Sequence, residues 1–262
     1  MSEERYPVIF VGAGPGDPDL ITLKGQRAVK EADRIIYAGS LVPEALLKWA
    51  NPEAEKFNSA SMDLKEIVDS MVEAFNESKR VVRLHTGDPS LYGAIFEQML
   101  ELDERSIPYQ VVPGVTAAFA AAASMKLEYT LPEITQTLII TRIAGRTPVP
   151  EAESLASLAS HQASMVIYLS IKQIDKVAAV LKTAYGEDAP CAVAYRASQP
   201  EEKIIATRIK DLAARVREEN ITHQAIIIVS KALETRKKGL KSKSKLYDKK
   251  FSHEFRKGNS ER

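Results

Sequence analysis

The 262-residue sequence predicts an α/β protein with two domains, each built on a mainly parallel or mixed sheet. Short runs rich in β-branched residues alternate with segments of helical periodicity, which is the pattern of strands joined by covering helices. The alternation occurs in two successive series. Glycine-rich turns directly follow several of the predicted strands, and α/β proteins commonly bind ligands at such strand ends.

The first series begins with a β-branched and aromatic run at 8–11, which predicts a strand that stops at Gly12. The helix predicted over 63–75 has the clearest periodicity, and Asp63 with Glu66 forms a capping box at its start. The other elements expected in this series are a helix over 22–31 and strands over 34–37, 81–84 and 109–112.

The second series follows an Ala-rich stretch at 116–123, which we expect to form a buried helix whose small side chains allow close packing. We place the domains at 1–114 and 115–232, followed by a basic tail at 233–262. The expected strands are 138–141, 165–169, 191–195, 203–207 and 225–229, and the expected helices are 151–159 and 174–184.

The composition is that of a soluble globular protein, with 45% hydrophobic and 27% charged residues. The apolar runs are too short to cross a bilayer, and the acidic first residues are not followed by the apolar core of a signal peptide. The single cysteine, Cys191, excludes an internal disulfide and fits a reducing cytoplasm. The four histidines have no metal-ligand spacing. We therefore expect a cytoplasmic protein with no membrane partner and no metal site.

The formal net charge of +1 is unevenly distributed. Residues 231–262 hold 12 Lys and Arg against 4 Asp and Glu, a net charge of +8, whereas residues 1–230 hold 24 against 31, a net charge of −7. A basic tail on an acidic body can contact nucleic acid or a polyanionic small molecule, or can simply be solvated.

The first candidate site is the glycine-rich turn at 11–18, directly after the first strand. Its glycines let the backbone turn sharply and approach a bound group. The turn departs from a dinucleotide-binding fingerprint, because Gly16 follows Gly14 too closely, prolines interrupt the helix start, and no acidic residue ends the second strand. A tight turn with a purely structural role is the alternative.

Two further candidates follow later strands of the first series. The loop at 85–93 contains Gly87, which makes room for a ligand, and Asp88, which can accept hydrogen bonds from a ligand or cap the next turn. At 112–117 a strand, a turn and the Ala-rich helix meet, and Thr116 suits either a ligand contact or a helix N-cap. Each motif alone is open to both interpretations.

Together and in this order, the motifs resemble the tetrapyrrole methylase family, and the resemblance covers residues from about 6 to about 232. Further segments resemble a subgroup of that family, the methyltransferases that act on C11 of precorrin-4 or cobalt-precorrin-4 in cobalamin biosynthesis. The family segments are 11–22, 87–89 and 113–116, and the subgroup segments are 37–43, 58–62, 244–248 and 255–257.

The resemblance implies two α/β domains with the active site in the cleft between them, and a homodimer. It implies an enzyme that binds S-adenosylmethionine in a folded conformation, transfers its methyl group to a tetrapyrrole carbon and leaves S-adenosylhomocysteine. Cofactor contacts of the family carry over to residues near several strand ends. These residues are Pro15, Thr86, Gly87, Asp88, Leu91, Tyr92, Thr116, Ala117, Leu169, Tyr195, Arg196, Ala197 and Thr207.

One departure from the family concerns the pathway step. Uroporphyrinogen methylases have an Asp at the position of Ala38 and a Lys in the region of Ser59 and Ala60, with proton-transfer roles assigned to both. Their absence here argues against that earlier step. It also leaves no inherited general base, so no catalytic residue is assigned.

The implied substrate carries several carboxylates, so we expect cations to bind it, with Arg as the better bidentate partner. An ordinary surface position is the alternative for any single cation, but we expect at least two to contact the substrate. The candidates near predicted strand ends are Arg83, His85, Arg142, Arg146, Lys172 and again Arg196.

Other functions remain open at this point. The same fold could methylate another corrin-ring carbon, or an RNA or protein acceptor, and a non-catalytic nucleotide-binding regulatory module would share the fold. We expect no nucleic-acid partner, because we find no aromatic residues interleaved with basic ones of the kind that bind single strands.

Overall fold

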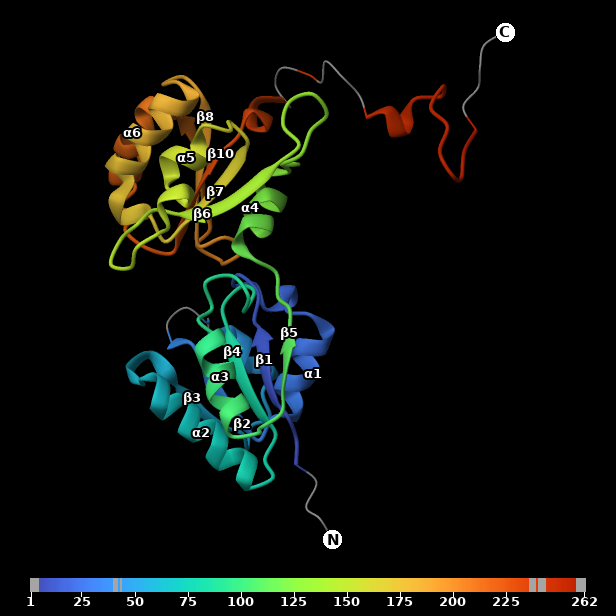
Figure 1. Cartoon of the computed structure of the whole chain (residues 1–262), viewed down its shortest axis with the longest axis vertical. Helices are drawn as coiled ribbons and strands as arrows, with labels where there is room; N and C mark the ends of the chain where they lie inside the picture. Colours follow the sequence, from blue (N-terminus) through green and yellow to red (C-terminus); the bar gives the residue numbers. More distant parts are fainter. Residues whose placement is uncertain (1–4, 40–41, 43, 236–238, 240–243, 258–262) are drawn as a thin grey trace. The chain divides into compact units, whose positions relative to one another are not determined.

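The structure is a computed structural model that describes residues 5–39, 42, 44–235, 239 and 244–257. The chain forms two compact units. Unit 1 comprises Met1–Ala121 together with Arg196–Glu202, and unit 2 comprises Ala122–Tyr195 together with Lys203–Arg262. The second half of the sequence therefore contributes one short segment to the first unit. Figure 1 shows the chain coloured along its sequence.

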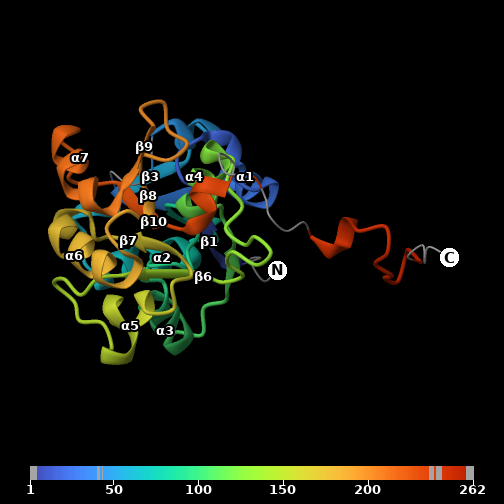
Figure 2. The ribbon, with the colours of Figure 1, turned by 90° about the horizontal axis from the view of Figure 1, so that it is seen from above.

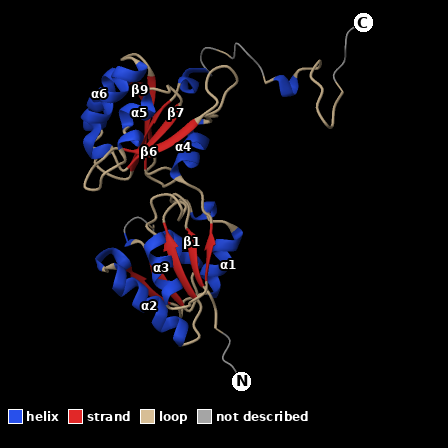
Figure 3. Ribbon diagram, in the orientation of Figure 1, coloured by secondary structure: helices blue, strands red, loops and turns tan. Residues whose placement is uncertain are grey.

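Unit 1 is built on a five-stranded sheet of β1 (Val8–Gly12), β2 (Arg34–Tyr37), β3 (Glu55–Asn58), β4 (Val81–His85) and β5 (Tyr109–Val112). The strands lie in the order β3-β2-β4-β1-β5, and every neighbouring pair is parallel. All five strands therefore end along one edge of the sheet, the unit 1 carboxyl edge (Figure 3). The predicted strands of this unit are confirmed, and β3 was not predicted.

Helices cover both faces of the unit 1 sheet. Successive residues of a strand point to opposite faces, so β1 contributes apolar side chains to both. Val8 and Phe10 of β1 pack with α2 (Leu64–Asn76) and α3 (Phe96–Glu104), whereas Val11 packs with α1 (Leu23–Glu31) on the other face. The predicted capping box of α2 is present. Short 3₁₀ helices lie at Pro18–Leu20, Glu44–Trp49 and Ser59–Ser61.

Unit 2 has a mixed five-stranded sheet of β6 (Leu138–Arg142), β7 (Ser164–Tyr168), β8 (Pro190–Tyr195), β9 (Lys203–Arg208) and β10 (Ala225–Val229). Their order is β6-β7-β10-β8-β9. Strands β6, β7 and β8 point one way, and β9 and β10 point the opposite way. The ends of β6, β7 and β8 form what we call the unit 2 carboxyl edge.

One face of the unit 2 sheet packs against α5 (Leu155–Ala159), α6 (Ile174–Tyr185) and α7 (Leu212–Glu218), which lie together in Figure 2. Their apolar residues and those of the strands form a single core. Helix α4 (Ala117–Met125) lies where the chain passes from unit 1 to unit 2. Further 3₁₀ helices lie at Glu151–Glu153, Ile171–Gln173, Ile209–Asp211, Lys231–Glu234 and Lys245–Tyr247.

Two helix predictions need correction. The helix predicted over 151–159 is divided into a 3₁₀ turn and α5, because Ser154 has extended backbone and caps α5 by accepting a hydrogen bond from the Ser157 N–H. The Ala-rich helix exists, but it is not buried throughout, since Phe119 is 54% exposed. No helix in the described part of the chain is long and apolar enough to cross a membrane.

Candidate functional site

Three glycines meet where β1, β4 and β5 end at the unit 1 carboxyl edge. A Cβ atom added to Gly114 would lie 2.1 Å from the carbonyl oxygen of Gly87 and 2.8 Å from Cα of Gly12. A Cβ atom on Gly12 would lie 2.6 Å from Cα of Gly114. These are distances that real Cβ atoms do not tolerate. Only glycine therefore lets the three backbones come together at what we call the glycine junction.

Gly87 presents an open backbone surface beside this junction. Its backbone pairs with that of Gly14 in an antiparallel bridge, with N–H to O distances of 3.2 Å and 2.8 Å. Its φ of 64° lies in the left-handed region that favours glycine. A Cβ atom added to Gly87 would have Cα of Thr116 as its nearest neighbour, at 3.9 Å. One further atom therefore fits against the backbone of Gly87, at van der Waals distance from Thr116.

Asp88 ties the loop after β4 to the loop after β5. Its carboxylate accepts hydrogen bonds from the N–H of Gly114 and the N–H of Ser90, both at 2.9 Å, and also from the hydroxyl of Ser90. Partial burial opposes ionisation of this carboxyl, but the hydrogen bonds outweigh it and lower the pKa of Asp88. Asp88 is therefore a charged anchor inside the predicted cofactor loops.

The segment Arg196–Glu202 holds the glycine-rich turn of unit 1. The Ser198 hydroxyl accepts a hydrogen bond from the N–H of Asp17 at 3.0 Å, and the Gln199 amide donates one to the carbonyl of Pro15 at 3.2 Å. The Gln199 side chain also fills the space that a side chain at position 16 would need. A Cβ atom added to Gly16 would lie 2.2 Å from Cγ of Gln199. Ser198 and Gln199 were not predicted from the sequence, because their partners are more than 180 residues away.

Three predicted cofactor residues have left-handed backbone without being glycine. They are Tyr92 (φ 56°), Leu169 (φ 53°) and Arg196 (φ 46°), and each lies in a loop shortly after a strand. Several of the other left-handed residues follow helix ends, where this conformation is common. For an L-residue it costs roughly 1–2 kcal/mol, and such strain tends to gather at ligand sites. Leu169 is also 69% exposed, which is unusual for a strained apolar residue.

At the unit 2 carboxyl edge, the loops after β6 and β7 are joined by Ser170. Its hydroxyl accepts a hydrogen bond from the N–H of Ile143 at 2.9 Å and donates one to the carbonyl of Tyr168 at 2.6 Å. The Gln173 amide also donates to the carbonyl of Ala144 at 3.1 Å. Because Ser170 is buried, these bonds fix the positions of the two loops relative to each other.

The predicted substrate cations of this edge differ in availability. Arg142 donates hydrogen bonds to the carbonyls of Thr147 and Pro148, at 3.2 Å and 2.7 Å, so it holds its own loop. Arg146 and Lys172 are exposed, and neither has a partner within the described ranges. Arg196 pairs with Glu201, with an N to O distance of 3.6 Å.

Arg83 and His85, by contrast, are buried inside unit 1, and each is 4% exposed. Arg83 donates hydrogen bonds to the side chain of Gln98 at 3.1 Å and the carbonyl of Ile36 at 3.2 Å. Burial lowers its pKa to about 10. Burial, with a further contribution from Arg83, lowers the pKa of His85 to about 3, so this ring is neutral. These contacts join β4 to its neighbours, and substrate binding by either residue stays a prediction.

The other predicted cofactor residues divide between the two units. Pro15, Thr86, Leu91, Thr116, Ala117 and Ala197 belong to unit 1, and Tyr195 ends β8 at the unit 2 carboxyl edge. Thr207 is set apart, because it pairs with Cys191 at the opposite end of β8. Its position gives no support to its assignment. No group of three or more His, Cys, Asp or Glu residues that could hold a metal ion occurs in the described part of the chain.

Comparison with known proteins decides the family. The sequence profile of the tetrapyrrole (corrin/porphyrin) methylases matches residues 7–213. The chain belongs to this family. The resemblance inferred from the motifs of the sequence is thereby confirmed, and so is the α/β fold class with one parallel and one mixed sheet.

Individual members of the family are also similar to this chain. The cobalt-precorrin-4 C(11)-methyltransferase of Methanocaldococcus jannaschii is 53% identical over 256 residues, which cover 97% of this chain and 98% of that protein. A match of this length includes most of the basic C-terminal residues. The X-ray structure of a cobalt precorrin-4 methyltransferase, a cobalamin biosynthetic enzyme, has a TM-score of 0.84 and 46% identity over 86% of this chain and 95% of that one.

A more distant solved structure includes a ligand in its description. It is a uroporphyrin-III C-methyltransferase from Thermus thermophilus, complexed with S-adenosylhomocysteine. Its TM-score is 0.70 and its identity 28%, over 88% of this chain and 94% of that one.

Proposed function

We propose that this protein is an S-adenosylmethionine-dependent C-methyltransferase that methylates C11 of precorrin-4 or cobalt-precorrin-4 in cobalamin biosynthesis. The observation that carries the proposal is the 53% identity to a C11-methyltransferase over nearly the full length of both chains. The lack of an Asp at Ala38 and of a Lys at Ser59 and Ala60 supports the same choice over a uroporphyrinogen acceptor.

The glycine junction and the residues around it fit an S-adenosylmethionine site. Gly87 has an open backbone face, and Asp88 holds that backbone against Gly114. Pro15 is fixed by Gln199, and Tyr92 in the loop after β4 has left-handed backbone. When bound, the cofactor supplies a methyl group on a sulfonium, which is already an activated electrophile.

The residues of the chain then have to position and enclose the reactants. An electron-rich ring carbon of a reduced tetrapyrrole is a competent nucleophile, so no strong general base is required. Correct alignment of two reactants contributes about 7–11 kcal/mol to lowering a barrier in favourable cases. Excluding water from the site also prevents hydrolysis of a reactive group. The fixed loops after β1, β4 and β5 suit this positioning role.

Binding of the substrate carboxylates requires exposed cations that are not already paired within the protein. Arg146 and Lys172 follow neighbouring parallel strands, and we propose that they bind carboxylates of the tetrapyrrole. Ser170 and Gln173 hold the two loops that carry them. Fixed loops favour binding, because less conformational freedom is lost when the ligand arrives.

We further propose that the protein acts in the cytoplasm as a homodimer. Cys191 is a buried free thiol whose pKa burial raises to about 12, so it suits a reducing compartment. Phe96 and Leu100 lie one turn apart on α3 and are 65% and 47% exposed. Such an apolar helix face is suited to burial against a second chain. A light-scattering mass equal to that of one chain would contradict the dimer.

Binding of S-adenosylhomocysteine, measured by calorimetry, is the first test of the proposed function. Wild-type protein is expected to bind it, and Asp88→Ala is expected to weaken binding about tenfold or more, because the partly buried N–H of Gly114 loses a charged acceptor. Asp69→Ala is the matched control, since Asp69 forms only an exposed ion pair with Lys65 on α2. No binding by well-folded wild-type protein would overturn the proposal.

Turnover identifies the acceptor. Precorrin-4 and cobalt-precorrin-4 are each incubated with the enzyme and S-adenosylmethionine, and the products are analysed by mass spectrometry and NMR. We expect the mass gain of one methyl group, located at C11, with at least one of the two substrates. Methylation at another ring carbon would place the enzyme at a different step of the pathway.

A further inference from the structure

The C-terminal residues Ser244–Lys257, which we call the aromatic–basic segment, present aromatic side chains to solvent. Tyr247, Phe251 and Phe255 follow one another at intervals of four residues and are 79%, 39% and 88% exposed. Single exposed apolar residues are normal, but several of them close together in one short segment can form a binding surface. This finding corrects the sequence analysis, which expected no aromatic residues interleaved with basic ones.

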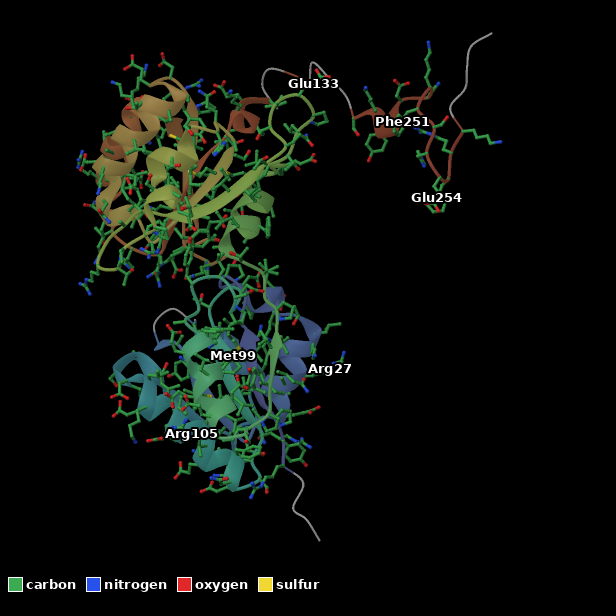
Figure 4. All side chains as sticks on the ribbon, in the orientation of Figure 1. Arg27, Met99, Arg105, Glu133, Phe251 and Glu254 are labelled. Carbon is green, nitrogen blue, oxygen red and sulfur yellow. The ribbon has the colours of Figure 1, made fainter. Side chains whose placement is uncertain are left out.

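The segment has an internal structure that displays these rings. The backbones of His253 and Arg256 pair through hydrogen bonds of 2.8 Å and 2.9 Å. The Arg256 guanidinium also donates a hydrogen bond of 2.7 Å to the carbonyl of Asp248. A turn closed in this way carries Phe251 at one end and Glu254 near its tip (Figure 4). Ordering of this kind reduces the entropy that is lost when a ligand binds.

Cations lie between the aromatic residues. Lys245, Lys249 and Lys257 are exposed, and none has a partner in the described part of the chain. Flat aromatic rings beside free ammonium groups suit a ligand that is itself flat and carries several negative charges. A polycarboxylate macrocycle and single-stranded RNA both have these properties.

The family of the chain favours the macrocycle over RNA, because similar proteins are named for tetrapyrrole substrates. The charge distribution suits a polyanion of this kind. Residues 1–230 carry a net charge of −7, which repels a polyanionic substrate at long range. Among the cations predicted to bind that substrate, Arg83 and His85 are buried, Arg142 holds its own loop and Arg196 pairs with Glu201. Arg146 and Lys172 are exposed and have no partner in the described part of the chain. A substrate with several carboxylates therefore needs further cations, and residues 231–262 carry a net charge of +8.

We propose that the aromatic–basic segment is a second binding element for the tetrapyrrole substrate. Tyr247 and Phe255 stack on the macrocycle, and Lys249 and Lys257 pair with its peripheral carboxylates. The proposal rests on the proposed function, because it takes its ligand from there. It assigns a substrate-binding role to a region that lies beyond residues 7–213, the part matched by the family as a whole.

The test uses full-length protein and uroporphyrin I, an octacarboxylate porphyrin whose fluorescence reports binding. Tyr247→Ala/Phe255→Ala, which removes two stacking contacts, is expected to raise the Kd for uroporphyrin I at least about tenfold. Lys249→Glu/Lys257→Glu, which reverses two ion pairs, is expected to raise it about tenfold. In turnover, KM for the tetrapyrrole is expected to rise by a similar factor, with kcat nearly unchanged.

Lys24→Glu/Lys176→Glu is the matched control, because it changes the net charge equally at exposed, unpaired lysines of α1 and α6. The control is expected to bind uroporphyrin I nearly as tightly as wild type. Equal losses of porphyrin affinity in the control and in Lys249→Glu/Lys257→Glu would mean that net charge alone causes the effect, and would overturn the proposal. Unchanged porphyrin affinity in both segment variants would also overturn it.

Two further measurements separate this proposal from its alternatives. S-adenosylhomocysteine affinity is expected to be the same in wild type and segment variants. If wild type itself fails to bind S-adenosylhomocysteine, the proposed function fails, and the segment proposal fails with it. A poly(U) oligonucleotide is the RNA probe. Weakened poly(U) binding with unchanged porphyrin binding in the segment variants would assign the segment to nucleic acid instead.

Discussion

At the scale of single residues, the glycine junction sets the strictest requirement on side-chain size. Backbone atoms from three strand ends fill the space that a methyl group at Gly12 or Gly114 would need. Glycine-rich turns are usually explained by backbone conformation, but no left-handed φ occurs at these two positions. The requirement here is close packing between backbones, and it places the loops that we propose hold the cofactor.

Gly114→Ala tests this requirement. The added methyl group would lie 2.1 Å from the carbonyl oxygen of Gly87, and the free energy of unfolding is expected to fall by about 3 kcal/mol, at the upper end for overpacking. S-adenosylhomocysteine affinity should fall with it. Gly186→Ala is the control, because that position has empty space around it and a φ of 87°. The control should lose roughly 1–3 kcal/mol as well, because its φ of 87° and ψ of 155° lie in a region that is essentially restricted to glycine. It should nevertheless bind S-adenosylhomocysteine normally, which separates the effect on the site from a loss of stability.

His85 makes the stability of the protein depend on pH. The pKa of this ring is about 3 in the folded protein and about 6.5 when unfolded, so the unfolded chain binds a proton that the folded one excludes. The contribution of neutral His85 to the stability of the fold is therefore fully present above pH 6.5, and it is lost as the pH falls towards 3. Between pH 7.5 and pH 5, wild type should lose about 2 kcal/mol more than His85→Leu. Urea unfolding of both proteins at both pH values measures this difference. An equal loss of unfolding free energy in wild type and His85→Leu would refute it.

At the scale of elements, the contact between the segment Arg196–Glu202 and the glycine-rich turn is what sequence reasoning could not find. The repeating apolar pattern predicts α2, and a run of β-branched residues predicts β10, because local periodicity reflects which face is buried. The contact of Ser198 with Asp17 leaves no local pattern, since it joins residues that are far apart in sequence.

The elements that were missed have physical reasons of their own. In α3, Phe96 and Leu100 are exposed while Gln98 is buried, so its pattern does not match a helix with one apolar face. Strand β3 lies at the edge of its sheet and is mostly exposed, so it lacks an apolar run. At the site, sequence motifs predicted the loops of the glycine junction, but which cations are buried and which are free depends on tertiary packing.

The double variant Ser198→Ala/Gln199→Ala tests the role of the segment. It removes the hydrogen bonds to the N–H of Asp17 and the carbonyl of Pro15, which should cost about 1–2 kcal/mol of stability. Because the glycine-rich turn is then less fixed, S-adenosylhomocysteine affinity is expected to fall several-fold. Thr183→Ala removes a hydroxyl bonded within α6 and serves as the control. Unchanged affinity in the double variant would show that the turn holds its shape without the segment.

At the scale of the whole molecule, residues 1–230 and residues 231–262 carry opposite net charges, and we expect this difference to affect the binding of a charged substrate. The net charges of −7 and +8 nearly cancel, so the sum of +1 conceals a strong dipolar distribution. Exposed charges interact over a Debye length, which is about 10 Å at 0.1 M salt and about 3 Å at 1 M.

Ionic strength should therefore separate the two ligands. We expect KM for the tetrapyrrole to rise several-fold between about 0.05 M and 0.5 M salt, because its carboxylates meet exposed cations that salt screens. The Kd of S-adenosylhomocysteine, a ligand with no net charge, should change much less. Lys249→Glu/Lys257→Glu should show a weaker salt dependence of KM than wild type. Equal salt dependence of both ligands would contradict this account.

The return of the chain to unit 1 at Arg196–Glu202 also bears on how the protein is made. A chain emerging from the ribosome has delivered all five strands of unit 1 by residue 112. Its glycine-rich turn still lacks Ser198 and Gln199, which arrive only after most of unit 2 has been synthesised. The first unit can thus build its sheet early, but it completes its ligand-binding edge late. A nascent chain arrested before residue 196 should hold a folded sheet and yet bind S-adenosylhomocysteine poorly.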